Sequence, residues 1–146
     1  MKDFPVSLNR VWWALRIGLG LGAFLAGLDK FFNLLTNWSM YLSPFAEQML
    51  PFDSTTFMHI VGVIEMAVGA AILTKWTREA SFVAAAWLAM IAINLVVSGM
   101  FFDLAVRDLE MSIAAIALGT LTHVRNSEQP RVARATKRLA RHSATA

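Results

Sequence analysis

The chain has 146 residues and a formal net charge of +3, with 57% hydrophobic and 16% charged residues. Soluble domains contain about 25% charged residues, and a soluble helical bundle needs a polar stripe on every helix, so this composition indicates a membrane protein. The sequence contains no cysteine, which excludes disulfides, thiol redox chemistry, cysteine-ligated metals and iron–sulfur clusters on this chain. No cleavable signal is expected, because the first apolar run is longer than the apolar core of a signal peptide.

The first apolar stretch covers residues 11–35 and exceeds the roughly 20 residues that a membrane-spanning helix needs. Aromatic residues mark both of its ends, as in interfacial belts: Trp12 and Trp13 at one end, and Phe31, Phe32 and Trp38 at the other. Its glycines favour close contact with a second helix: Gly18, Gly20, Gly22 and Gly27. The stretch therefore predicts a first transmembrane helix.

A polar and aromatic connection follows over residues 36–56 and contains no Lys or Arg. Ser43 and Pro44 form a suitable N-cap and N1 pair. They predict a short interfacial helix over residues 44–49, which Pro51 is expected to end.

The remaining apolar stretches predict three further transmembrane helices, over residues 57–76, 79–100 and 103–124. A capping-type run that starts at Asp53 precedes the first of these. Thr77, in a tight basic turn, is expected to be the N-cap of the next. Asn94 is the one strongly polar residue in the interior of the helix over 79–100.

Residues 1–125 thus form a predicted four-helix membrane domain, and residues 126–146 a basic cytoplasmic tail. Pro130 is expected to break the tail from the fourth span. The tail is expected either to lie on anionic lipid headgroups as an amphipathic helix or to be disordered, and no nucleic-acid site is expected. Its basic residues are Arg131, Arg134, Lys137, Arg138 and Arg141.

The Lys and Arg residues alternate between the connections. The N-terminal segment, the turn at residues 75–78 and the tail are basic, whereas the first and third connections carry no Lys or Arg outside the span ends. The positive-inside rule therefore places both termini in the cytoplasm. The expected fold is all-α, a four-transmembrane-helix up-and-down bundle.

Successive spans run in opposite directions across the membrane. Many polar residues therefore lie in the outer half of the predicted bundle: Lys30, His59, Glu65, Asn94, Asp103, Arg107, Asp108 and Glu110. Arg16 lies near the inner face and is expected to form a structural ion pair with an acidic residue. Ionisable residues in membrane spans are functional candidates by default, because they are costly there. His59 has no second histidine opposite it, since His123 lies at the inner end, so neither a bis-histidine haem nor a metal site is expected.

Helical phase sharpens this grouping. Arg16, Gly20, Gly27 and Lys30 share one stripe at about 100° per residue, so Lys30 is expected to point into the bundle. Asp103, Arg107 and Glu110 share another stripe and are expected to form ion pairs. Asp108 lies off that stripe and is expected to reach another helix.

Acids outnumber bases in this half, and Glu65 is the deepest of them. Glu65 is therefore expected to be partly protonated or to meet a cationic or hydrogen-bonding ligand. A structural interpretation stays open beside the functional one, because small bundles use buried ion pairs to set helix register. Under it Asn94 bonds a neighbouring helix, His59 is an ordinary hydrogen-bonded histidine, and Asp29 and Asp103 are solvated span ends.

Two motifs resemble the DoxX-like family of small four-helix membrane proteins. The first is the run from Leu15 to Gly20 that leads to Phe24, Gly27, Lys30 and Phe31; the second is the run from Val63 to Gly69 before the basic turn. The resemblance covers the first three predicted spans, and the family's usual C-terminal motif is replaced by the basic tail. It implies an up-and-down bundle in a bacterial inner membrane, with Arg16, Lys30 and Glu65 at family-pattern positions. Some relatives are associated with thiosulfate:quinone oxidoreductase or redox-stress complexes, and most have no assigned activity.

Three functions are compatible with these observations. The first is a quinone-interacting subunit of a membrane redox complex, with electrons supplied by a partner or by a bound molecule. Its proton relay would use Glu65 and Asp108, and its ligand would contact Lys30, His59, Asn94 and Arg107. The second is a non-enzymatic membrane scaffold or stabilising partner whose polar cluster is structural. The third is a homo-oligomeric proton-coupled carrier that uses Glu65.

Overall fold

A computed structural model describes the backbone of residues 6–143 and the side chains of residues 6–127. This part of the chain folds into α-helices and one 3-10 turn, without strands: α1 (Val6–Asp29), η1 (Trp38–Tyr41), α2 (Pro44–Met49), α3 (Ser54–Leu73), α4 (Thr77–Val97) and α5 (Phe102–Ser143). The predicted all-α class is confirmed.

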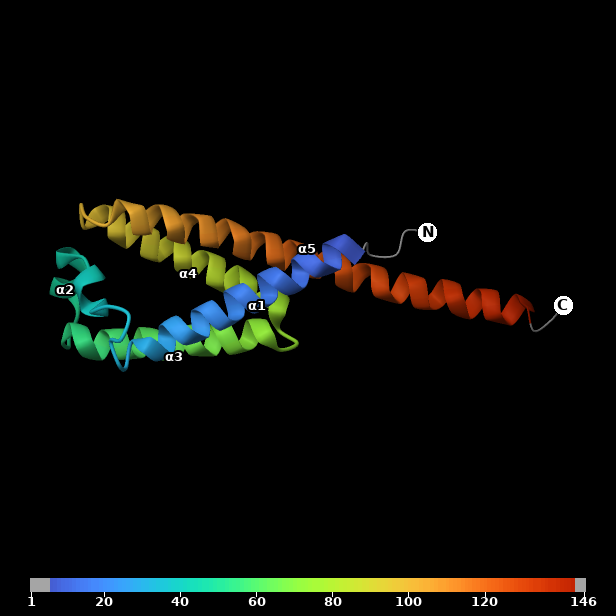
Figure 1. Cartoon of the computed structure of the whole chain (residues 1–146), viewed down its shortest axis with the longest axis horizontal. Coiled ribbons are helices and arrows are strands. Elements are labelled where there is room, and N and C mark those ends of the chain that lie inside the picture. Colours follow the sequence, from blue (N-terminus) through green and yellow to red (C-terminus); the bar gives the residue numbers. More distant parts are fainter. Residues whose placement is uncertain (1–5, 144–146) are drawn as a thin grey trace.

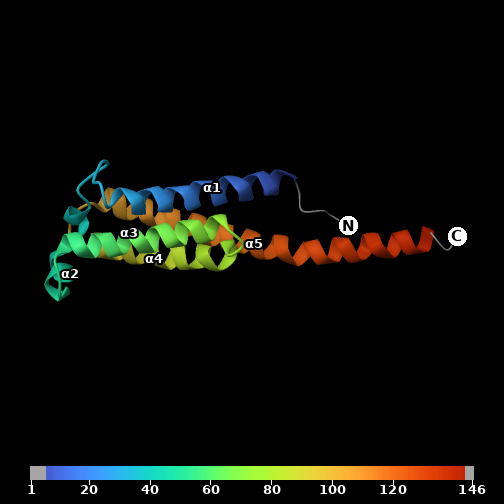
Figure 2. The same cartoon turned by 90° about the horizontal axis from the view of Figure 1, so that it is seen from below.

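The four long helices lie side by side along one axis and alternate in direction (Figure 1). α1 packs mainly on α3, and α5 packs mainly on α4. The short α2 and its connections lie at one end of the bundle, and the start of α1 and the turn between α3 and α4 lie at the other. α5 runs on past that second end as a single extended helix (Figure 2).

Three helices are long and apolar enough to cross a membrane, α1, α3 and α4. Their outward faces carry large apolar side chains that are more than half exposed, such as Leu25, Val63 and Ile93. Such faces suit lipid rather than water, so the protein is membrane-embedded. α5 does not belong to this group, because ionisable residues crowd its first turns.

The backbones of α1 and α3 touch each other through glycines. A Cβ atom on Gly27 would lie 2.5 Å from the carbonyl oxygen of Gly62, and one on Gly69 would lie 2.6 Å from that of Gly20. Real Cβ atoms do not approach so closely, so only glycine permits this spacing of the helices. Gly22, by contrast, has nothing within 4 Å of its Cβ position.

The interior between the two helix pairs is small and apolar. Its main cluster contains mostly alanine and aliphatic side chains: Trp12, Leu19, Ile72, Ala80, Ala84, Ala85, Ala115 and Leu118. The alanines let α4 and α5 approach closely, and the buried Ser112 hydroxyl donates to the Ala85 carbonyl at 2.8 Å. A second cluster, of Ala92, Leu95 and Ala105, lies nearer the α2 end.

Two predicted helix starts are confirmed. The Ser43 hydroxyl caps α2 by accepting a hydrogen bond from the Ala46 amide at 3.2 Å, with Pro44 as the first helical residue. The Asp53 carboxylate caps α3 by accepting from the Thr56 amide at 2.9 Å. Both caps satisfy amides that the helix itself leaves without partners.

The predicted end of the first helix at residue 35 is wrong, since α1 ends at Asp29. The chain turns away through Asn33, which has a positive φ of 50°. The Asp29 carboxylate accepts hydrogen bonds from the amides of Leu34 and Leu35. These bonds stabilise a turn that the apolar composition of the stretch did not reveal.

The prediction of Thr77 as an N-cap is also wrong, because α4 begins at Thr77 and its cap position is Trp76. The buried Thr77 hydroxyl donates to the carbonyl oxygens of Ile72 and Thr74 at 2.8 Å each and closes the end of α3 instead.

The predicted helix break at Pro130 between the fourth span and the tail is also wrong, since α5 continues to Ser143. The basic side chains of the tail lie outside the described side chains.

Replacing Gly27 with Ala is expected to lower the free energy of unfolding by about 1–3 kcal/mol, because the added methyl group overpacks the α1–α3 contact. The matched control is Gly22→Ala on the same helix. It should be neutral or stabilise slightly, since alanine favours the helix and meets no neighbour. Thermal unfolding of both variants in detergent micelles measures the difference, and equal stabilities would contradict the close-contact argument.

Candidate functional site

The central feature of the site is an ion pair between α1 and α3. Lys30 Nζ lies 2.6 Å from Glu65 Oε2, and the two side chains are only 3% and 11% exposed. The glycine contact sets this geometry, because a Cβ on Gly62 would lie 3.2 Å from the Lys30 Cβ and one on Gly27 would lie 3.0 Å from the Glu65 Cβ. The structure thus places Lys30 inside the bundle, as its helical stripe predicts. The partner of Glu65 is this lysine of the chain itself, whereas the sequence led us to expect a protonated carboxyl or a bound ligand.

Trp38 covers the ammonium group from the loop that follows α1. Lys30 Nζ lies 3.8 Å from the centre of the Trp38 ring, within the range of a cation–π interaction. The Trp38 indole donates to Asp29 Oδ2 at 2.8 Å. Asp29 is therefore not a solvated span end, since it is 8% exposed and holds both Trp38 and the turn after α1.

Asp108 of α5 lies within electrostatic range of this pair. Its carboxyl group is half-buried, and the charges that act on it are those of Arg107, Glu65 and Lys30. Among the side chains of residues 6–127 it has no hydrogen-bond or ion-pair partner. We call Lys30, Glu65 and Asp108 the polar triad.

Asn94 of α4 is engaged by the loop rather than by another helix. Its amide nitrogen donates to the Tyr41 carbonyl at 2.9 Å, and its amide oxygen accepts from the Ser43 amide at 3.3 Å. The interpretation of Asn94 as a helix–helix hydrogen-bonder is therefore wrong, because the loop brings unpaired backbone groups closer than any helix does. Asn94 fixes the connection before α2 over the C-terminal part of α4.

Trp87 is a polar residue that the sequence did not single out. Its indole nitrogen is buried and has no hydrogen-bond partner among the described side chains. Trp87 lies two turns before Asn94 on the same face of α4. A buried donor without a hydrogen-bond partner is uncommon in proteins. The sequence could not reveal this one, because a tryptophan in an apolar helix is usually a packing residue.

His59 makes an aromatic contact instead of a polar one. Its ring stacks on Phe31 with centroids 4.8 Å apart and planes 6° from parallel. The structural interpretation expected a hydrogen-bonded histidine, but His59 forms no hydrogen bond among the described side chains. Its role in ligand binding stays a prediction.

The charged stripe at the start of α5 forms no ion pair among the described side chains. Asp103, Arg107 and Glu110 are all exposed, so the predicted pairs are wrong. Exposed pairs of long side chains gain little, because ordering the chains offsets a screened attraction. Arg107 has no hydrogen bond to the triad, and its contact with a ligand stays a prediction.

Arg16 also lacks the predicted acidic partner. Its guanidinium donates to the carbonyl oxygens of Ile72 at 3.0 Å and of Leu73 and Thr74 at 2.6 Å each. These carbonyls end α3 and have no partner within the helix. A cation at this end also complements the helix dipole, so Arg16 caps α3 from α1.

No group of acidic and histidine residues within the described part of the chain has the arrangement of a metal site. A lysine ammonium has three N–H groups. One of them donates to Glu65, and the ammonium also makes a cation–π contact with the Trp38 ring. Lys30 thus keeps donor capacity for one further acceptor.

No known protein family, no curated protein and no solved structure matches this chain.

Replacing Lys30 with Met, or Glu65 with Met, is expected to lower the free energy of unfolding by about 3–5 kcal/mol, because each change leaves a buried charge without its partner. The double variant K30M/E65M should recover much of this loss, since it removes both charges. The exposed Glu110→Gln is the control and should change stability by no more than about 0.5 kcal/mol. Additive losses in the double variant would contradict a coupled pair.

Proposed function

We propose that the chain is a DoxX-like protein of a bacterial inner membrane that spans the bilayer four times with both termini in the cytoplasm. The three apolar helices and the motifs around Lys30 and Glu65 support this proposal. The fourth span is the part of α5 that packs against α4, residues 103–124. Its charged first turns would lie at the outer surface, where exposed Asp103 and Glu110 meet headgroups and water.

This topology is testable because the chain has no native cysteine. Single cysteines at Gln48 and Met100 should react with a membrane-impermeant maleimide in intact spheroplasts. Cysteines at Lys75 and Asn126 should react only after permeabilisation, and all four positions are exposed on the protein. Labelling of Met100→Cys and Asn126→Cys from the same side would show that α5 does not cross the membrane.

Within this topology the polar triad serves as the contact site for a quinone headgroup in a membrane redox complex. One observation carries this function: a buried Lys30–Glu65 pair joins α1 to α3, and its charges act on the half-buried Asp108 carboxyl, which has no partner among the described side chains. A quinone site needs a hydrogen-bond donor at apolar depth and a nearby carboxyl that exchanges protons. The three helices supply both groups at one place.

The roles of the residues follow from their contacts. Lys30 would donate to a headgroup oxygen and Glu65 would hold the ammonium in position, while Asp108 would pass a proton between the site and the outer surface. A bound quinone supplies two-electron redox chemistry. The electrons come from a partner protein, because this chain lacks the cysteines of thiol and iron–sulfur centres.

A short-chain quinone at a hundred times its Kd is expected to stabilise the detergent-purified protein by about 2.7 kcal/mol. For a chain of this length that raises Tm by roughly 5–10 °C. Asp108→Asn should reduce this shift by half or more, whereas Asp103→Asn, an exposed carboxyl on the same helix, should leave it unchanged. The absence of any quinone-induced shift in the parent protein would refute the quinone site.

A second function is a non-enzymatic membrane scaffold. It is favoured because the Lys30 ammonium is already in contact with both Glu65 and the Trp38 ring. In that case the pair only joins α1 to α3. The K30M/E65M variant separates the two functions, because it keeps the packing and removes the donor. A scaffold would keep its partner in this variant, whereas a quinone subunit would lose the quinone-induced rise in Tm.

A further inference from the structure

Two arginines converge on one tryptophan at the end of the bundle opposite the polar triad. The guanidinium carbon of Arg16 lies 4.8 Å from the centre of the Trp12 ring, and that of Arg125 lies 4.1 Å from it. Arg16 belongs to α1 and Arg125 to α5, helices that are otherwise in limited contact. Two like charges therefore meet on a single aromatic ring.

The ring itself is held rigidly between these helices. Trp12 is 2% exposed, and its indole nitrogen donates to the Thr122 hydroxyl at 2.8 Å. That hydroxyl in turn lies 2.7 Å from the Leu118 carbonyl. A fixed ring keeps both guanidinium groups in place without an anion, so the site is preorganised.

No carboxylate within the described side chains forms an ion pair with either arginine. Arg16 uses its Nε and one terminal nitrogen for the carbonyls that end α3, which leaves its other terminal nitrogen without a partner there. Arg125 forms no hydrogen bond among the described side chains. Two neighbouring guanidinium edges with unused donors match an oxygen-rich anion such as a phosphate, which arginine binds with two parallel hydrogen bonds.

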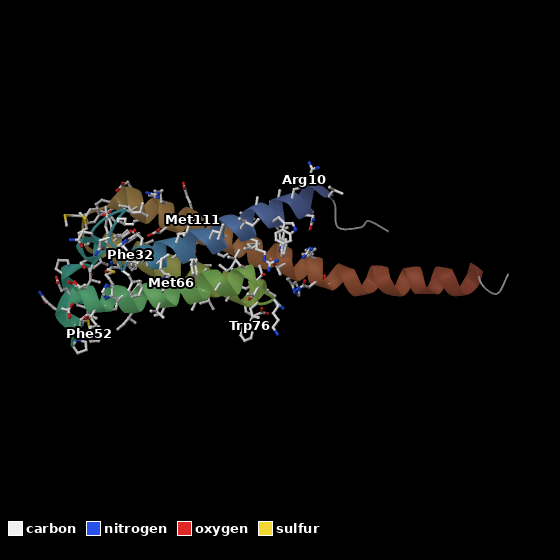
Figure 3. The ribbon with its side chains drawn as sticks, turned by 60° about the horizontal axis from the view of Figure 1, so that its bottom comes forward. Arg10, Phe32, Phe52, Met66, Trp76 and Met111 are labelled. Atoms are coloured by element: carbon white, nitrogen blue, oxygen red, sulfur yellow. The ribbon has the colours of Figure 1, made fainter. Side chains whose placement is uncertain are left out.

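The surroundings of the two arginines are those of a membrane surface. Trp13, which follows Trp12, is 44% exposed, and Trp76 in the turn between α3 and α4 is 60% exposed. Exposed tryptophans are enriched at the level of lipid headgroups. Figure 3 shows Arg10 and Trp76 toward this end of the bundle and Phe32 and Phe52 toward the other.

We propose that Arg16 and Arg125 bind the phosphate of an anionic phospholipid at the α1–α5 contact, with the Trp13 ring against the lipid. This site is separate from any contact of the basic tail with lipid. It requires only that this end of the bundle lies at a bilayer surface, in whichever leaflet, and it does not depend on a quinone at the other end. Bound lipid would join α1 to α5 through charge where few side chains join them directly.

The test compares Tm in nanodiscs of phosphatidylcholine alone and of phosphatidylcholine with phosphatidylglycerol. The anionic lipid should raise the Tm of the parent protein, and Arg125→Gln should weaken the apparent affinity for it about fivefold, the effect of one basic residue near a membrane surface. Arg125→Lys, which keeps the charge but not the planar donor pair, should lie between the two. Arg10→Gln removes a charge from the same end of α1 without touching Trp12 and should have the smaller effect.

A variant with all five basic tail residues from Arg131 to Arg141 changed to Gln separates this site from the tail. It should keep most of the stabilisation by phosphatidylglycerol if Arg16 and Arg125 bind the lipid. Loss of the stabilisation in the tail variant, or an unchanged response in Arg125→Gln, would overturn the proposal. Equal stabilisation by inorganic phosphate in phosphatidylcholine nanodiscs would overturn the assignment to a lipid.

Discussion

The backbone contact between α1 and α3 is the constraint on which the rest of the structure depends. Gly27 meets Gly62, and Gly20 meets Gly69, at distances that no side chain permits. Helices this close leave no room for a second shell of side chains between them. Lys30 and Glu65 therefore approach as neighbours at the edge of the contact, and their charges are shielded from solvent by the same helices that bring them together.

The face of α1 that packs on α3 has a cation at each end of the contact between the two helices. Arg16 reaches the last carbonyls of α3, and Lys30, about 21 Å further along at 1.5 Å per residue, reaches the carboxylate of Glu65. α1 is thus joined to α3 by charge at both ends and by glycines between them. In a lipid environment, where apolar packing alone gives little preference for one neighbour over another, such contacts specify the partner and the register.

The two ends of the bundle consequently differ in character. One end collects the polar triad beneath a loop held by Asp29, Trp38 and Asn94. The other collects arginines around Trp12 beneath the long extension of α5. The acid-rich end and the base-rich end are chemically distinct, and they separate the proposed quinone contact from the proposed lipid contact. Failure of one therefore says nothing about the other.

Local chemistry and helical periodicity in the sequence determined the all-α class, the caps at Ser43 and Asp53, and the inward position of Lys30 on its glycine-rich stripe. These depend on residues within one or two turns of each other. Only the tertiary structure decided that Glu65 is the partner of Lys30, that Trp38 covers it, and that Arg16 binds carbonyls instead of a carboxylate. Each of these contacts joins residues distant in the chain, and a hydrogen bond to a backbone carbonyl has no signature in residue type. The pairs predicted along α5 failed for the converse reason, since spacing on a helix permits a contact but burial decides whether it forms.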